Sequence, residues 1–332
     1  MIIVENKSLN PRLNHAIELF LMDNFDEDIF MFWKNRPSIL IGRFQNIDME
    51  VNLEFTKKTD MDVVRRLSGG GAIYCDPGNM QYSFITKDDS QNVNDSFRSF
   101  AEPVVAALRS LGLPAEFSGR NDIEINGMKV SGNAQFKQNG KILHHGTLLY
   151  EANLYNLKNA LKARDIKMKS HHVASHRARV GFIGDMIDMD INAFMAYIEE
   201  YIIKAYGIKE RYTLSEEEMQ AVIDIKEAIF DQPTWNYGER KLRDFYKREK
   251  HKAGLVELGV DLKDNVIRGI SIEGDFFSDA GLEDLKQRLL GAQLSRQALE
   301  ERLEDIHVEE CISGMDRDLF ITEMMKIREA EL

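Results

Sequence analysis

A run of glycines behind two arginines is the first feature of this sequence with a chemical meaning. Residues 69–71 are all glycine, and they follow Arg65, Arg66 and Ser68. Glycine lets the backbone approach a ligand closely, and successive N–H groups can point at a bound anion. The run lacks the Lys-Ser/Thr ending of a P-loop, and no helix with dinucleotide-binding spacing follows it. It predicts either an anion-binding loop, with Arg65 or Arg66 adding charge, or a tight structural turn, and the residues alone favour neither.

A lysine lies among three stretches that are rich in polar residues. The stretches are 121–122, 127–135 and 144–149, and Lys129 lies between two apolar residues of the second. A lysine in such a place ordinarily reaches out to solvent along its apolar stem. Turned inward, its ammonium would neutralise a carboxylate and the phosphate that the carboxylate attacks. Polar residues crowded on short strands favour a functional interpretation, because burying them for no purpose is costly.

The sequence contains two adjacent histidines and two distant cysteines, which could indicate a metal site or a nucleophile. The pattern favours neither a metal site nor a cysteine nucleophile. His144 and His145 should point to opposite faces of a strand, and no other cluster of His and Cys has metal-ligand spacing. We therefore expect one imidazole to pack within the sheet and the other to face the cleft. Cys75 precedes a turn and has no evident base beside it, which favours a structural residue over a nucleophile.

The elements that must position these residues begin with a helix. Apolar residues recur at helical spacing after Asn10 and Pro11, and proline is well tolerated in the first turn. Short stretches rich in β-forming residues then predict strands of one sheet: 29–33, 38–41, 62–65, 72–74 and 80–86.

A second helix and an antiparallel meander are expected next. The helix should span 95–111 and end before Gly112. Strands resume over 115–150, where Asn-Gly pairs at 126–127 and 139–140 are strong hairpin signals. Two further helices should pack on that sheet, 187–206 and 215–230, and the second begins with a capping-box pattern at Ser215 and Glu218.

The last third of the chain has the pattern of a separate small α+β unit. Periodicity breaks at 233–238, and the stretch 241–252 is strongly basic. A hairpin and three helices are then expected, over 255–261 with 266–272, and at 282–290, 296–303 and 319–328. Since 332 residues exceed the usual size of one domain, we predict a domain of residues 1–240 and another of 241–332.

Composition excludes several classes of protein. The net charge of -12, from 55 acidic and 43 basic residues, disfavours a protein that mainly neutralises nucleic-acid phosphates. Two cysteines cannot build a disulfide framework or a four-cysteine zinc site. No apolar run approaches the roughly 18 residues of a membrane span, and the start lacks the pattern of a secretory signal. We expect a cytoplasmic protein that binds neither nucleic acid nor membrane.

Taken together and in this order, the polar motifs resemble those of lipoate-protein ligases. The resemblance is specific, covers nearly the whole chain, and rests first on Arg65-Arg66-x-Ser68-Gly69-Gly70-Gly71-Ala72, Asp76-x-Gly78-Asn79, Asn121-Asp122, Lys129-x-Ser131-Gly132-Asn133-Ala134 and His145-Gly146-Thr147-Leu148-Leu149. Further similar segments are Gly42-Arg43-Phe44-Gln45-Asn46, Ser175-x-Arg177-x-Arg179-Val180, Trp235-x-Tyr237-Gly238 and Gly274-Asp275-Phe276-Phe277.

The resemblance implies a fold and a reaction. The fold is α+β, with a mixed or antiparallel sheet and packed helices as in biotin and lipoate ligases, followed by a small α+β C-terminal accessory domain. In the reaction, the lipoate carboxylate attacks ATP, with Mg²⁺, to form lipoyl-AMP and release pyrophosphate. A lysine of an acceptor lipoyl domain then takes the lipoyl group. Implied acceptors are the E2 subunits of 2-oxoacid dehydrogenases or the H protein of glycine cleavage, and no permanently bound cofactor is expected.

The resemblance also implies roles for individual residues. Lys129 would be catalytic, bridging carboxylate and phosphate, and Asp122 would line the magnesium region. The other implied substrate and ATP contacts are Arg66, Ser68, Gly69, Gly70, Gly71, Ala72, Asn79, Ser131, Asn133, Ala134, His145, Gly146 and Thr147.

Two departures keep other functions in view. Cys75 stands where many relatives have histidine, and the segment 169–176 is rich in histidine where the family usually has a glycine-containing loop. One alternative is a carrier-to-carrier octanoyl or lipoyl transferase, which would use a cysteine thioester without ATP. Another is a non-catalytic lipoate-binding homologue. A biotin ligase fits less well, because its loop interleaves Gly and Arg.

Overall fold

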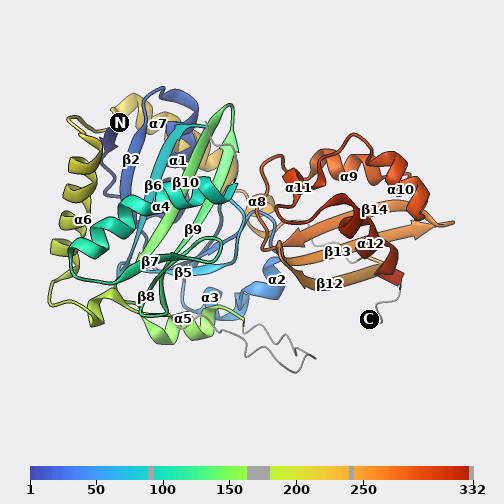
Figure 1. Ribbon diagram of the computed structural model, residues 1–332, viewed down its shortest axis with the longest axis horizontal. Coiled ribbons are helices and arrows are strands. Elements are labelled where there is room, and N and C mark those ends of the chain that lie inside the picture. The colour runs from blue at the N-terminus through green and yellow to red at the C-terminus, as the bar shows by residue number, and fades with distance from the viewer. Residues whose placement is uncertain (89–92, 163–179, 239–242, 329–332) are drawn as a thin grey trace. The chain divides into compact units, whose positions relative to one another are not determined.

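The computed structural model describes residues 1–88, 93–162, 180–238 and 243–328 (Figure 1). The chain forms two compact units. The first comprises Met1–Leu40, Glu50–Val64 and Ile73–Asn236, and the second comprises Ile41–Met49, Arg65–Ala72 and Tyr237–Leu332. The histidine-rich segment 169–176 and the motif of Ser175, Arg177 and Arg179 lie outside the described residues.

An eight-stranded mixed sheet is the centre of the first unit (Figure 1). Its strand order is β11-β1-β2-β6-β10-β9-β8-β7. β1 runs parallel to β2 and β11, and the other neighbours pair antiparallel, as the expected fold class requires. In chain order the strands are β1 (Ile2–Val4), β2 (Ile29–Lys34), β6 (Asn79–Lys87), β7 (Ala115–Ser118), β8 (Asp122–Ile125), β9 (Met128–Gln138), β10 (Lys141–Leu149) and β11 (Arg211–Tyr212).

The two Asn-Gly pairs form the hairpins that the sequence predicted. One joins β8 to β9 and the other joins β9 to β10, and both connections are antiparallel. Asn126, Gly127, Asn139 and Gly140 all have positive φ. Two consecutive residues of positive φ make the tight turn whose twist matches that of paired strands. These turns place β8, β9 and β10, the strands with the polar motifs, side by side.

The prediction of a single sheet for the early strands is wrong. β3 (Ser38–Ile41), β4 (Asp62–Arg65) and β5 (Ile73–Cys75) form a separate three-stranded sheet in the order β4-β3-β5. The regular strand pattern is interrupted at Pro37, between β2 and β3, because proline cannot donate a hydrogen bond to a neighbouring strand. Strand patterns reveal where strands lie, but pairing is decided by contacts that are distant in sequence.

Helices cover both faces of the large sheet. α4 (Val93–Ser110) and α6 (Ile191–Tyr206) pack with Phe84 and Val130 in one apolar core. α1 (Pro11–Asn24) packs against β2, β6 and β10, and the side chains it meets, such as Ser83, alternate with those that face α4. Figure 1 shows α4 in front of the sheet and α1 behind it. The site motifs on β10 therefore have a helix on each side.

The expected helix boundaries follow from capping residues. The Asn10 side chain accepts hydrogen bonds from the first N–H groups of α1. Ser215 and Glu218 form the predicted capping box of α7 (Glu216–Ile225), which continues as a π-helical turn, Lys226–Phe230. The shorter helical segments of the first three-quarters of the chain are α2 (Ile47–Glu50), α3 (Leu53–Lys58), α5 (Leu154–Ala160), Ile183–Asp185 and α8 (Pro233–Tyr237).

The C-terminal part is a small α+β unit, as predicted. Its sheet has the order β12-β13-β14, with bounds Phe245–His251, Gly254–Lys263 and Val266–Gly274. β12 was not expected, because its charged residues conceal the strand pattern. Helices pack on this sheet around buried residues such as Leu285 and Phe320: α9 (Glu283–Leu289), α10 (Arg296–Arg302), α11 (Val308–Cys311), α12 (Arg317–Met325) and the final turn Lys326–Arg328.

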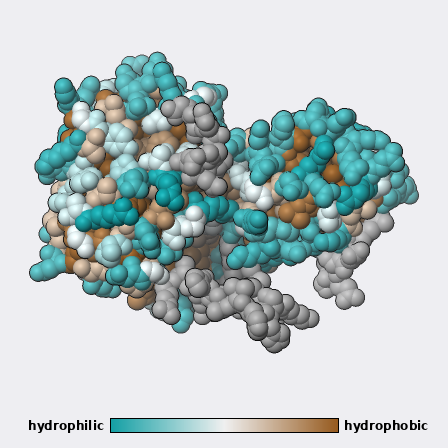
Figure 2. All heavy atoms as spheres, in the orientation of Figure 1, coloured by the Kyte–Doolittle hydropathy of each residue, from teal (hydrophilic) through white to brown (hydrophobic). Residues whose placement is uncertain are grey.

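Most large apolar side chains are buried, which leaves a mainly polar surface. Figure 2 shows mostly hydrophilic residues on the face presented, with smaller apolar areas between them. Within the part of the chain that the structure describes, no helix has both the length and the hydropathy needed to cross a membrane.

Candidate active site

A β-bulge directs Lys129 on β9. Ile123 pairs with Ser131 whereas Glu124 pairs with Lys129, so β9 has one extra residue, Val130, at this point. The Val130 side chain is fully buried in the core. A bulge changes the alternation of side chains and can re-aim one of them. Here the ammonium lies across Gly132, where an added Cβ would be 3.1 Å from Nζ.

Lys129 forms an ion pair with Asp122 on the neighbouring strand. Lys129 Nζ lies 2.6 Å from Asp122 Oδ1, and the two side chains are 29% and 26% exposed. The pair is therefore partly covered yet open to solvent on one side. By the resemblance, Lys129 would contact the reacting carboxylate and phosphate, and Asp122 would line the magnesium region. The Lys129 and Asp122 side chains are in direct contact.

His144 is the histidine that packs within the sheet. Gln135 Nε2 lies 3.0 Å from His144 Nδ1, and Asn133 Oδ1 lies 3.1 Å from His144 Nε2. Burial, and then the charge of His145, hold the pKa of His144 well below its ordinary value. The imidazole is thus neutral: Nε2–H donates to Asn133, and Nδ1 accepts from Gln135.

The Asn133 side chain forms several hydrogen bonds within the first unit. Its Oδ1 accepts a short hydrogen bond from the hydroxyl of Tyr82. Its Nδ2 donates to the Asn121 carbonyl at 3.0 Å, and the Asn121 side chain donates back to the Asn133 carbonyl at 2.6 Å. These bonds fasten the chain immediately before Asp122. Gly146 is needed beside them, because a Cβ there would lie 2.3 Å from Asn133 Oδ1.

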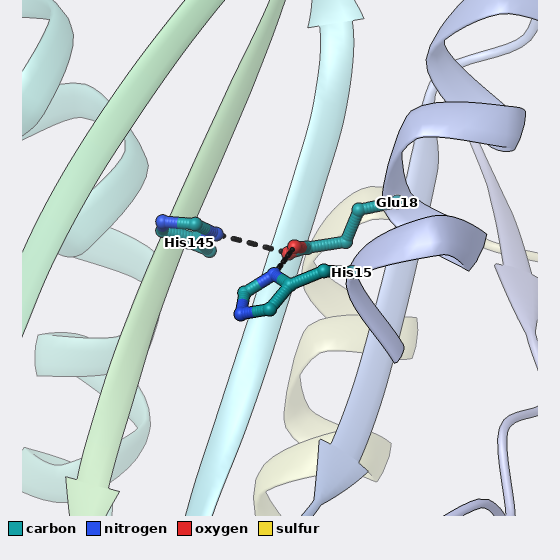
Figure 3. A group of neighbouring side chains, drawn as sticks. All are labelled: His15, Glu18 and His145. Atoms are coloured by element: carbon teal, nitrogen blue, oxygen red, sulfur yellow. Dashed lines mark hydrogen bonds and ion pairs between the residues drawn. The ribbon is translucent and has the colours of Figure 1, made fainter. Parts of the chain in front are cut away.

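His145 and Thr147 lie on the opposite face of β10. Thr147 Oγ1 accepts a hydrogen bond of 3.2 Å from the N–H of Gly132, the residue that Lys129 crosses. His145 Nδ1 lies 3.0 Å from a carboxylate oxygen of Glu18, which comes from α1 together with His15 (Figure 3). The expectation that the adjacent histidines face opposite ways is confirmed.

Asn79 and Cys75 belong to a buried polar group near the start of β6. Gln81 Nε2 donates to Asn79 Oδ1 at 2.8 Å and contacts Cys75 Sγ at 3.5 Å. Asp76 Oδ1 accepts from the N–H of Gly78, which closes the turn between β5 and β6. Cys75 is fully buried.

The glycine loop lies in the second unit and is held by Arg66. The Arg66 guanidinium donates to the carbonyls of Gly69 and Gly71, at 2.7 and 2.9 Å, and to Ser68 Oγ at 3.1 Å. These bonds fix the loop in a curved conformation, in which Gly70 has a φ of +89° that other residues rarely adopt. Ala72 ends the loop before β5.

Arg65 also forms hydrogen bonds with backbone carbonyl groups. Its Nη1 donates to the carbonyls of Gly42, Arg43 and Gln45, at 2.9, 3.0 and 2.8 Å. Burial, with a smaller contribution from the charge of Arg43, lowers the pKa of Arg65 to about 10, so the guanidinium stays protonated at neutral pH. The segment 42–45, a further part of the resemblance, is thereby attached to the loop.

Close contact with 276–277 explains why the loop requires glycine. The N–H of Gly70 donates to the carbonyl of Phe276 at 3.2 Å. A Cβ on Gly69 would lie 2.2 Å from that same oxygen, and one on Gly70 would lie 3.2 Å from the Phe277 ring. Both contacts lie within the second unit.

The structure therefore groups the candidate residues in two sets. In the first unit, β6, β8, β9 and β10 bring together Asn79, Asp122, Lys129, Ser131, Asn133, Ala134, His145, Gly146 and Thr147. In the second, one loop contains Arg66, Ser68, Gly69, Gly70, Gly71 and Ala72. Sequence reasoning missed Glu18 and His15, although a histidine and a charged residue three positions apart, within the apolar stretch of a helix, were a usable signal.

Two known protein families match this chain. The family described as "Lipoyl protein ligase A/B catalytic domain" matches residues 10–203, and "Bacterial lipoate protein ligase C-terminus" matches residues 243–323. The chain belongs to the lipoate-protein ligase family. The first match includes both sets of candidate residues.

Relatives in this family match over almost their full length. The lipoate-protein ligase LplJ of Bacillus subtilis (strain 168) is 34% identical over 97% of this chain and 99% of its own. Lipoate-protein ligase 1 of Staphylococcus aureus is 36% identical over 95% of this chain and 97% of its own.

Solved structures agree with the fold. LipL1 of P. falciparum, crystallised in complex with lipoate, has a TM-score of 0.79 over 98% of both chains; at 20% identity it supports the fold alone. A lipoate-protein ligase A crystallised with ATP is 27% identical, with a TM-score of 0.62 over 71% of this chain and 97% of its own.

Proposed function

We propose that this protein is an ATP-dependent lipoate-protein ligase that activates lipoate as lipoyl-AMP and then acylates a lysine of an acceptor lipoyl domain. The observation that carries the proposal is the Lys129–Asp122 pair, aimed across Gly132 by the bulge in β9. The family membership, and a lipoate-protein ligase A that was crystallised with ATP and is 27% identical to this chain, support it. Formation of a mixed anhydride converts a poorly reactive carboxylate into an acylating agent.

Lys129 is proposed to stabilise the charge that collects when the lipoate carboxylate meets the α-phosphate. An ammonium fixed beside those oxygens needs no reorganisation during the reaction, which is the main source of catalysis at many charged centres. Asp122 holds that ammonium in place before the substrates bind. The pair therefore preorganises the cation.

Asp122 also fits a role beside the magnesium ion that accompanies ATP. Mg²⁺ prefers oxygen ligands and is often held by one or two carboxylates together with substrate phosphates. Asp122 supplies one such carboxylate, and it is partly exposed. The ion, when bound, would offset the charge of the triphosphate.

The other candidate residues are proposed to shape the substrate sites. Gly69, Gly70, Gly71 and Ala72 would contact the lipoyl or adenylate group, with Arg66 and Ser68 holding the loop's curvature. Ser131, Asn133 and Ala134 would flank the adenosine, and Asn79 would line the nucleotide region. His145, Gly146 and Thr147 would border the acyl slot.

The acceptor is proposed to be a lipoyl domain of a 2-oxoacid dehydrogenase E2 subunit or the H protein of glycine cleavage. An archaeal ligase studied with its E2 lipoyl domain is among the similar structures, which supports that class. We further propose that residues 1–240 act as the catalytic domain and 241–332 as the accessory domain.

The decisive experiment is exchange of labelled pyrophosphate into ATP by the purified full-length protein. We expect exchange that depends on lipoate, followed by a mass increase of one lipoyl group on an added lipoyl domain. Absence of exchange with lipoate and octanoate would count against the ligase. Modification of the carrier from an acylated donor protein, without ATP, would indicate the transferase.

A further inference from the structure

A chain of hydrogen bonds begins at the backbone carbonyl of Asn121, the residue before Asp122. This carbonyl accepts from the Asn133 N–H at 2.8 Å and from Asn133 Nδ2 at 3.0 Å. In return, the Asn121 side chain donates to the Asn133 carbonyl at 2.6 Å. Asp122 itself pairs with Gly132, the residue before Asn133. The start of β8 is therefore attached to β9 one residue away from the carboxylate that contacts Lys129.

The Asn121 carbonyl fixes the direction of the bonds that follow it. A backbone carbonyl only accepts, so the Asn133 atom that faces it must be the amide nitrogen, and the other amide atom is the oxygen. That oxygen, Oδ1, is bonded to the Tyr82 hydroxyl and lies 3.1 Å from His144 Nε2. Both of these neighbours must therefore donate, which places the proton of the His144 imidazole on Nε2.

The chain of bonds continues from His144 to α4. A neutral imidazole with its proton on Nε2 has an acceptor at Nδ1, and Gln135 Nε2 lies 3.0 Å from that atom. The same Gln135 nitrogen donates to Ser96 Oγ, on α4, at 2.9 Å. The side chains of Asn133, His144, Gln135 and Ser96 are all buried. Each orientation is thus set by the neighbouring group, from the start of β8 to α4.

Aromatic rings hold the His144 imidazole in place. The Phe100 ring stacks on it with a centroid distance of 5.0 Å, and the Phe97 ring meets it edge-on at 5.7 Å. Both rings come from α4. Tyr82 and His144 are fully buried. A buried polar network in which each member is bonded rigidifies its surroundings, so the donors on Asn133 Oδ1 have fixed positions.

This network and the ion pair of Lys129 lie on opposite faces of the sheet. A Cβ on Gly132 would meet Lys129 Nζ at 3.1 Å and Asp122 Oδ1 at 3.8 Å. The side chain of the next residue, Asn133, points to the other face, because successive side chains on a strand alternate. The route from Tyr82 and His144 to the ion pair therefore passes through Asn133 and the backbone of 121–122.

We propose that Tyr82 and His144 are positioning residues for the activation half-reaction, in which lipoate becomes lipoyl-AMP. They act through Asn133, because two donors on its Oδ1 keep its Nδ2 turned to the backbone just before Asp122. The Asp122 carboxylate is thereby held beside Lys129 before the substrates bind. This proposal rests on the proposed function, and the charge that stabilises the reacting oxygens remains that of Lys129. A misplacement of about 1 Å at such a group costs about 10²-fold in rate.

The first test reads the direction of the network and needs no activity. Long-range ¹H–¹⁵N spectra of histidine-labelled full-length protein, assigned by the signal lost in His144→Gln, are expected to show His144 as the neutral Nε2–H tautomer. Tyr82→Phe should keep this tautomer, because the Asn133 oxygen still needs a donor. A wild-type His144 with its proton on Nδ1 alone would overturn the proposal, since Nε2 could not then donate to Asn133.

The second test removes one donor and keeps its ring. Tyr82→Phe is expected to lower lipoate-dependent pyrophosphate exchange at saturating substrates by roughly tenfold, since the Asn133 amide is then less firmly oriented. Tyr150→Phe is the matched control: this buried tyrosine of the same core donates its hydroxyl proton to the Met189 carbonyl. Its exchange should stay within about twofold of wild type. Equal losses in the two variants, or unchanged exchange in Tyr82→Phe, would overturn the proposal.

The third test separates positioning from general destabilisation. In a Lys129→Ala background, Tyr82→Phe should change the residual exchange by less than about twofold, because the cation that Tyr82 helps to place is already gone and the two effects are not additive. A further loss of about tenfold in the double variant would show that Tyr82 acts by another route and would overturn the proposal. A wild-type protein without lipoate-dependent exchange would instead refute the proposed function, and the Nε2–H tautomer would still establish the network.

Discussion

Lys129 is the residue on which the proposed chemistry depends most. Lys129→Ala removes the cation that we propose lies beside the reacting oxygens, so pyrophosphate exchange should fall by about 10²–10³, the usual effect of losing a preorganised stabilising group. Stability should change little, because Lys129 and Asp122 are partly exposed. The matched control is Lys137→Ala on the same strand, which also loses an ion pair, to Asp88 at 3.3 Å. Equal effects of the two changes on exchange would contradict the assignment.

Cys75 distinguishes a ligase from a transferase. Its thiol is buried against Gln81 at the end of β5, and buried thiols of this kind are usually inert. Cys75→Ser should therefore leave transfer to a lipoyl domain within about threefold of wild type, as should Cys311→Ser. Transfer is measured by the mass of the carrier. Loss of transfer in the Cys75 variant, with exchange and folding intact, would favour a thioester mechanism.

Individual residues with a motif were recognisable in the sequence, but their partners were not. Lys129 and Asp122 were each identified from local patterns, yet their contact depends on the pairing of β8 with β9. Glu18 belonged to no recognised motif, and apart from His15 its partners come from strands far along the chain. Burial and hydrogen-bond partners of such groups are properties of the fold rather than of a segment.

At the scale of elements, Gly132 on β9 and Gly146 on β10 face opposite sides of the sheet. Substituting alanine at each should therefore mainly affect different properties: activity at Gly132 and stability at Gly146. A Cβ on Gly132 would meet only the flexible end of Lys129, at 3.1–3.2 Å, with Asp122 Oδ1 at 3.8 Å. A Cβ on Gly146 would lie 2.3–2.4 Å from Asn133 and Tyr82, which are buried and hydrogen-bonded to each other. The first substitution displaces the ammonium, and the second overpacks the sheet.

We therefore expect Gly132→Ala to lower pyrophosphate exchange without a change in thermal midpoint. Gly146→Ala should lower the free energy of unfolding by about 1–3 kcal/mol, the usual cost of overpacking. Denaturant titrations and exchange rates on both variants check the pair. A destabilised Gly132→Ala with normal exchange would contradict the position of Lys129.

Elements were predicted better than their details. Several strands and hairpin turns were placed almost at their observed bounds, because alternation and Asn-Gly pairs are local signals. The bulge at Val130 was not foreseen, since one extra residue leaves no mark in a polar strand. β12 was missed for a related reason: Lys247, Arg248 and Glu249 form ion pairs in the structure but looked like a solvated basic stretch.

At the scale of the whole molecule, the sequence predicted the components but not their grouping. The early strands divide between two sheets, and the segments Ile41–Met49 and Arg65–Ala72 group with the C-terminal residues. Hydrogen bonds such as those from Arg65 to the Gly42 and Gln45 carbonyls hold these segments together. No periodicity encodes an arginine that binds three carbonyls, so this grouping could only come from the structure.

The second unit should have a pH-dependent stability that originates at Glu323. Its buried carboxylate on α12 is bonded to Lys247 of β12 and, at 3.1 Å, to Lys326. Burial alone raises the pKa of Glu323, but these lysines, with a hydrogen bond to Glu249, outweigh burial and lower it to about 2. A carboxyl whose folded pKa is depressed stabilises the fold above its unfolded value of about 4.5 and loses that contribution as pH falls through the folded pKa.

Glu323→Gln should therefore destabilise the second unit by about 3 kcal/mol at pH 7, and the difference from wild type should shrink toward zero between pH 4.5 and pH 2. Hydrogen exchange of peptides from 243–328, measured by mass spectrometry at several pH values, follows this unit by itself. Glu283→Gln in the same unit is the matched control, since its side chain is 84% exposed and its pair with Lys286 should contribute little. A Glu323→Gln difference that stays constant with pH would mean that packing, rather than the charge of Glu323, stabilises this contact between α12 and β12.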